Sequence, residues 1–160
     1  MSDLLGDGNV KVTFVLAVAN ISAPTASELN AGVDLQEVLT KEGLDIKPDQ
    51  SAVDNTSLAS RAETEDAGTS KYTITLTWKK QKEEAADVAF TTLTPGTLGY
   101  LAVRRDRAHE TAWAADDPAE IYPVRAGVFG RQPPKLNEPQ TVEQKMFNHT
   151  EPDTEAVVAA

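Results

Sequence analysis

A strict alternation of apolar and hydroxyl side chains over residues 71–79, KYTITLTWK, is the feature that most constrains the fold of this chain. Tyr72, Ile74, Leu76 and Trp78 occupy one parity of the run, and threonines occupy most of the other. A period of two places successive side chains on opposite faces of a strand, so the run predicts a β-strand with one apolar and one polar face. Because Trp78 lies on the apolar face, we expect it in the core rather than on a binding surface.

Six further runs have the composition of strands. They are residues 10–18, 33–39, 44–53, 97–105, 120–128 and 141–149, and the first, VKVTFVLAV, is the most regular. Proline has no N–H to donate to a sheet, so Pro48 and Pro123 each predict an edge strand or a break in the strand that holds it.

Helical character is confined to two stretches. Residues 24–30 predict a single turn in which Thr25 and Glu28 have the spacing of a capping box. Residues 82–93 predict one helix of two to three turns, with acidic residues in its first turn. At 160 residues the chain is the length of one domain. We therefore predict a mainly β protein, an antiparallel β-sandwich or barrel of about seven to eight strands with one short flanking helix, in a single domain spanning 1–160.

Residues 54–70, DNTSLASRAETEDAGTS, carry no periodic pattern and only one sizeable apolar side chain, Leu58. A patternless loop of this length inside a compact domain is uncommon and is usually functional or disordered. The segment therefore predicts a long polar loop that is a candidate for function.

Charge and composition limit the possible functions. The chain has a formal net charge of −10, with 12 acidic and 4 basic residues in 1–70 against 13 and 11 in 71–160. An acidic chain is a poor match for nucleic-acid binding, which depends on Lys and Arg neutralising phosphates. Cysteine is absent, which excludes disulfides, zinc–thiolate sites and thiol catalysis. The first ten residues lack the pattern of a signal peptide and no run matches a membrane span, so we expect synthesis in a cytoplasm and no membrane association.

Residues that could carry chemistry are few. His109 and His149 have no second ligand at a usable spacing, and no phosphate loop, calcium loop or nucleophile elbow occurs. We expect no catalytic residues, no cofactor and no metal. Trp113 leaves one alternative open, a monomeric β-sandwich carbohydrate-binding module with this tryptophan on its surface.

The segment GYLAVRRD, 99–106, places Arg104 and Arg105 at the end of an apolar strand. Successive strand residues point to opposite faces, so the pair does not form the one-sided basic track that a phosphate backbone requires. A solvated strand end is one interpretation. The other is a subunit joint, where the Arg104 to Arg107 cluster, with Arg125 and Arg131, meets the acidic first half of a neighbouring copy.

Four segments together carry a family resemblance. They are SAPTASELNAGVDLQEVLTKEGLDI (22–46), DNTSLASRAET (54–64), LTPGTLGYLAVRRD (93–106) and TAWAADDPAEIYPVRAG (111–127). In this order the segments resemble the major tail tube proteins of long-tailed bacteriophages, especially those that infect actinobacteria. The similarity in pattern covers 22–150.

The resemblance implies a structural virion protein of the phage tail. Six copies would form a ring, and stacked rings would form an acidic tube through which DNA passes without specific binding. It implies no catalysis, and as partners it implies other copies of the chain together with tape measure, tail terminator and baseplate proteins. The long loop of such proteins reaches an adjacent ring, which here would place Leu58, Arg61, Glu63 and Asp66 at inter-ring contacts. Within a ring, we expect Arg104, Arg105 and Arg125 at the joints between subunits. A tail terminator or a contractile-system inner tube is the alternative within the same fold.

Overall fold

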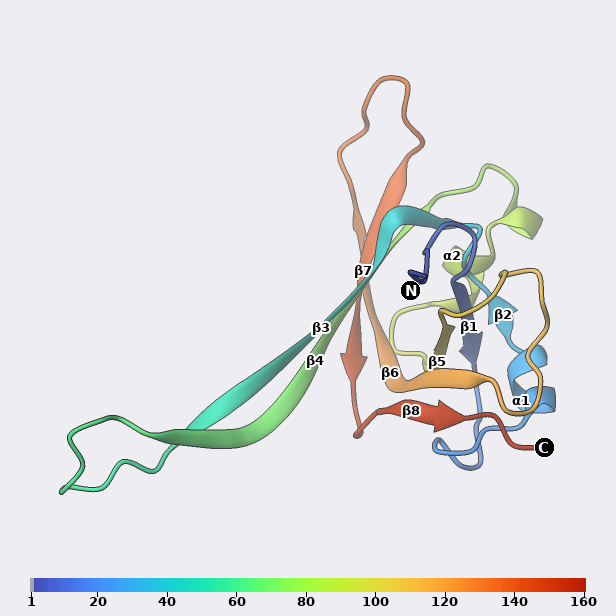
Figure 1. Ribbon diagram of the computed structural model, residues 1–160. Helices are drawn as coiled ribbons and strands as arrows, with labels where there is room; N and C mark the ends of the chain where they lie inside the picture. The colour runs from blue at the N-terminus through green and yellow to red at the C-terminus, as the bar shows by residue number, and fades with distance from the viewer. Residues whose placement is uncertain (1) are drawn as a thin grey trace.

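The computed structural model describes residues 2–160 and is mainly β (Figure 1). Its strands within these residues form one eight-stranded sheet in which every strand pairing is antiparallel, in the order β2-β1-β5-β6-β7-β4-β3, with β8 added to β6. The predicted fold class is therefore confirmed. The strands are β1 (Lys11–Val15), β2 (Val33–Asp34), β3 (Leu39–Asp54), β4 (Glu65–Lys79), β5 (Leu98–Arg104), β6 (Pro118–Arg131), β7 (Thr141–Asn148) and β8 (Asp153–Val157).

The core lies on both faces of β1 and β5. Successive residues of β5 face different clusters: Leu101 packs with Trp78 and the apolar side chains of β4, β6 and β7, whereas Ala102 packs with Trp113 and Ile121. Burial on both faces explains why β5 is a nearly continuous apolar run. In β1 the residues of the second face, Lys11 and Thr13, are also buried and bind the Asp34 carboxylate. Trp78 is fully buried, as predicted, with its ring edge-to-face against Phe129 at 5.8 Å between centroids.

The structure confirms the prediction for one of the two prolines and contradicts the other. Pro48 lies on β3, which is an edge of the sheet, as predicted. The prediction for Pro123 is wrong, because β6 is an interior strand. Along one side β6 pairs with β8 up to Ile121 and with β7 from Val124 onwards, so Pro123 lies where the partner changes and its missing N–H interrupts neither ladder.

Two short α-helices, α1 (Ala26–Asn30) and α2 (Val88–Thr92), occur within the described residues, where the sequence predicted one. At α1 the hydroxyl of Thr25 accepts from the Glu28 N–H at 3.2 Å, and the two side chains also bond, so the capping pair is confirmed. The longer helix predicted over 82–93 is wrong. A 3-10 turn (Glu84–Ala86) precedes α2, and between them the buried Asp87 leaves helical geometry and binds Lys80, which divides the stretch.

The boundaries of several predicted strands also differ, and two of these differences change the shape of the chain. The strand expected over 33–39 is only the two-residue β2, because the chain turns inward at Leu35, whose N–H donates to the Val12 carbonyl at 2.8 Å. Residues 65–70 of the expected loop belong to β4, so the loop proper is 55–64.

The β3–β4 hairpin is anchored in the core at one end only. A register shift between Leu39 and Leu44 places Gly43 against β4, where an added Cβ would lie 2.1 Å from the Thr77 carbonyl oxygen. Beyond this anchor, the hairpin leaves the body as a long twisted ribbon, at the lower left of Figure 1. We call residues 47–71 the arm.

Candidate assembly surfaces

The arm is a two-stranded ribbon that the rest of the described chain, residues 2–160, does not cover. Every residue of 47–71 is exposed except Thr56 and Gly68, which are half-buried. Isolated two-stranded hairpins are marginally stable in water, and they gain stability by packing against something else. The arm of a single chain therefore presents a surface suited to a partner.

Residues 54–66, which we call the arm tip, have their own internal hydrogen bonds. Thr56 and Thr64 bond across the loop, with the Thr64 N–H donating to the Thr56 hydroxyl at 2.8 Å. Hydrogen bonds from the Thr56 side chain and backbone hold the pKa of Asp54 below its usual value, so this carboxylate stays charged at neutral pH. The four residues expected at inter-ring contacts all lie here and are exposed: Leu58, Arg61 and Glu63 in the loop and Asp66 at the start of β4.

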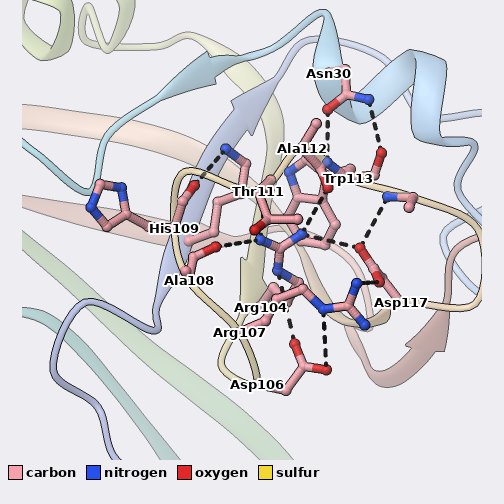
Figure 2. Close-up of polar contacts among 12 residues, drawn as sticks. Asn30, Arg104, Asp106, Arg107, Ala108, His109, Thr111, Ala112, Trp113 and Asp117 are labelled. Atoms are coloured by element: carbon pink, nitrogen blue, oxygen red, sulfur yellow. Dashed lines mark hydrogen bonds and ion pairs between the residues drawn. The ribbon is translucent and has the colours of Figure 1, made fainter.

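Arg104 is buried inside its own chain, whereas a residue at a subunit joint would be exposed. Its side chain is 1% exposed, and its guanidinium donates to the Asp117 carboxylate at 3.1 Å and to the carbonyls of Ala108, Thr111 and Ala112 (Figure 2). These bonds fold residues 106–117 around one cation. The buried arginine leaves no guanidinium surface for a neighbouring subunit and instead organises the loop of its own chain.

Asp117 and Trp113 complete this buried cluster. Asp117 is 1% exposed and lies between two cations, because Arg107 binds its second oxygen at 3.1 Å. Trp113 is 3% exposed, lies beneath the Arg104 guanidinium at 5.2 Å, and donates its indole N–H to the Thr13 hydroxyl. The carbohydrate-module alternative required Trp113 at the surface, and the structure contradicts it.

Arg105 and Arg125, unlike Arg104, are exposed. Arg105 pairs with Glu120 at 2.5 Å, and Glu120 also accepts from the Tyr122 hydroxyl, whose pKa is raised by burial and by this carboxylate. Arg125 projects from β6 in register with Leu98 on β5 and Phe147 on β7, both of which are half-exposed. The outer face of the sheet thus carries a row of apolar, cationic and aromatic side chains.

The comparison with protein families identifies the family of this chain. A family model described as phage tail tube protein matches residues 1–160, which is the whole chain. The chain belongs to this family. No curated protein matches it. Membership makes the protein a structural component of the phage tail that assembles with copies of itself into the tail tube.

The described part of this tail tube protein, residues 2–160, holds no group of three His, Asp or Glu side chains placed to bind a metal ion. Over the same range no helix is long and apolar enough to cross a membrane. His109 pairs with the neighbouring Glu110 at 3.2 Å, and its carbonyl accepts from Lys11. Its backbone therefore helps to fasten the 106–117 loop to β1.

Sequence reasoning missed two exposed apolar residues of the tail tube protein. Leu136, in the loop between β6 and β7, is 93% exposed, and Phe147 is exposed on β7. Phe147 was visible in the sequence, since it has the opposite parity from Val142, Gln144 and Met146. Nothing in the local pattern RQPPKLNEPQ marked Leu136, because its exposure depends on how far the hairpin extends beyond the sheet.

Proposed function

We propose that six copies of this chain close into a ring, and that stacked rings form the tail tube of a long-tailed phage through which DNA leaves the virion. The observation that carries the proposal is the arm, a long ribbon exposed on nearly every residue and anchored only at its base. A ribbon of this kind gains its stability by lying on a neighbouring copy. The ring number comes from the resemblance in the sequence.

The open edge of β3 supports ring closure. Among the strands that the structure describes, β3 pairs with β4 alone and on one side, which leaves the outer edge of a 16-residue strand available. Exposed edges of this length invite pairing with other chains, and joining sheets around a ring removes them. A contact repeated through a fixed rotation closes into a ring when the rotation divides a full turn.

Charge supports a role as a conduit. A ring of six would carry six times the formal charge of −10, so a passing DNA molecule is repelled rather than held. In this proposal DNA passes without specific binding, and tape measure, tail terminator and baseplate proteins define the length and ends of the tube.

Inter-ring contacts in this proposal come from the arm tip, namely Leu58, Arg61, Glu63 and Asp66. Arg105 and Arg125 contact the neighbouring subunit within a ring. Arg104 contributes indirectly, because its hydrogen bonds fix the position of the loop that comes after Arg105.

Reversing the charge of Arg125 tests the joint within the ring. We expect Arg125→Glu to raise the protein concentration needed for assembly, with a larger increase at low salt than at high salt, because salt screens contacts between exposed charges. Sedimentation velocity at two ionic strengths measures this. Arg125→Gln is the matched control, with a smaller and less salt-dependent effect. Equal effects of Arg125→Glu at both ionic strengths would contradict an electrostatic contact.

Electron microscopy of the purified protein across a concentration series, with sedimentation alongside, tests the proposed function itself. We expect six-fold rings and hollow tubes above a threshold concentration. A single ring that never stacks would instead indicate a terminator-like component. Monomer at every concentration, also in the presence of isolated baseplates as initiators, would contradict the proposal.

A further inference from the structure

The β3–β4 and β6–β7 hairpins extend from opposite ends of the sheet, because they meet along the neighbouring strands β4 and β7. β4 and β7 are antiparallel, with Lys79 beside Thr141 and Ile74 beside Met146. The loop between β6 and β7, residues 132–140, therefore lies at the end where β4 finishes, whereas the arm tip lies beyond the end where β4 begins. Figure 1 shows the β6–β7 loop at the top and the arm at the lower left.

The two ends carry opposite charge. Residues 49–66 of the arm contain five acidic side chains and one basic one, Arg61. Residues 131–140 contain two basic side chains, Arg131 and Lys135, against one acidic one, Glu138, and all ten residues are exposed. The distal arm is thus acidic, and the β6–β7 loop is weakly basic.

Both ends also expose one large apolar side chain. Leu58 at the arm tip and Leu136 in the β6–β7 loop are 106% and 93% exposed, the two highest values among the exposed large hydrophobic residues. An exposed leucine alone is ordinary. Leu58 lies in the acidic distal arm and Leu136 in the weakly basic β6–β7 loop, at opposite ends of one sheet, which is the arrangement of a head-to-tail contact between successive copies.

The β6–β7 loop also provides a concave surface. A hollow of about 190 Å³ lies beside it, lined by residues that include Pro133, Lys135 and Pro139. Prolines restrict the backbone, so this hairpin is stiff relative to its length. A stiff concave loop suits a receiving surface, and the long ribbon of the arm suits the inserted one.

We propose that the β6–β7 loop of one copy is the docking surface for the arm tip of a copy in the next ring. This inference rests on the proposed function and names the partner surface of the arm. The contact is heterologous, since the tip of one copy meets the opposite end of the next, and such a contact repeats without limit along an axis. Its charges, Glu65 and Asp66 against Arg131 and Lys135, give it direction and register.

Cysteine cross-linking tests this contact, because the chain has no cysteine of its own. The double variant Leu58→Cys with Leu136→Cys carries one thiol at each end, and both positions are exposed, so folding is undisturbed. Treatment of assembled protein with a short bis-maleimide is expected to give a ladder of covalent multimers on denaturing gels. Each single variant has one thiol per chain and gives at most a dimer.

The matched control pairs Leu58→Cys with Leu16→Cys, a leucine just beyond β1 that is also exposed. We expect no ladder beyond the dimer from this control. Tubes that form normally, while the test pair gives no more ladder than the control, would overturn the β6–β7 docking surface and leave the proposed function standing. Failure of the unmodified protein to assemble under any condition would overturn both.

Discussion

Arg104→Met is expected to lower the free energy of unfolding by about 3–5 kcal/mol, the usual cost of removing one partner from a buried ion pair. The guanidinium of Arg104 is fully buried and donates to the Asp117 carboxylate and to three carbonyls of the 108–112 segment. Methionine keeps much of the apolar stem but supplies no donor. Asp117 then remains buried with only Arg107 and the Ala114 N–H, and the three carbonyls lose their partner.

Urea denaturation measures this effect, and the slope of the transition shows whether the folded state has also expanded. Arg105→Met is the matched control, because the neighbouring arginine pairs with Glu120 at the surface, where such pairs contribute about 0–1 kcal/mol. Tryptophan emission provides a local readout, since Trp113 lies beneath the Arg104 guanidinium and a loosened loop exposes it to water. Equal losses of stability in the two variants would contradict the organising role of Arg104.

The strand pattern shows what a sequence of this type can predict. The alternation over 71–79 determined the strand, its buried face and the burial of Trp78, because parity alone decides which side of a half-covered strand meets the core. The Thr25–Glu28 pair was predictable for the same reason, since both partners lie within one turn of chain.

Features that depend on distant parts of the chain were not predictable. In the sequence, Arg104 stands at the end of a strand beside Arg105. It is buried because it binds Asp117 and the carbonyls of the 106–117 loop, and no local pattern predicts that this loop covers it. Pro123 is compatible with an interior strand only because β6 changes partner there. Residues 65–70 lack alternation because the arm has no core on either face, so no burial imposes a period on its sequence.

This lack of pattern is also the clearest indication of how the arm is used, and its removal is expected to abolish tube formation. Ala52 and Ala67 are partners in the β3–β4 ladder. Deleting residues 56–66 therefore leaves residues 53–55 as a three-residue loop between an existing pair, a common hairpin length. Because the removed segment is exposed apart from the half-buried Thr56 and lies outside both core clusters, the truncated chain should fold and unfold as the intact chain does.

We expect the truncated protein to form rings or remain monomeric but to form no stacked tubes, as seen by electron microscopy at concentrations where the intact protein forms tubes. A second variant separates the length of the arm from its chemistry. Replacing Leu58, Arg61, Glu63 and Asp66 with serine keeps the Thr56–Thr64 bonds and the full reach of the ribbon. If contact chemistry drives stacking, this variant fails as the deletion does, and if reach alone is needed, it still stacks. Normal tubes from the deletion itself would contradict an inter-ring role for the arm.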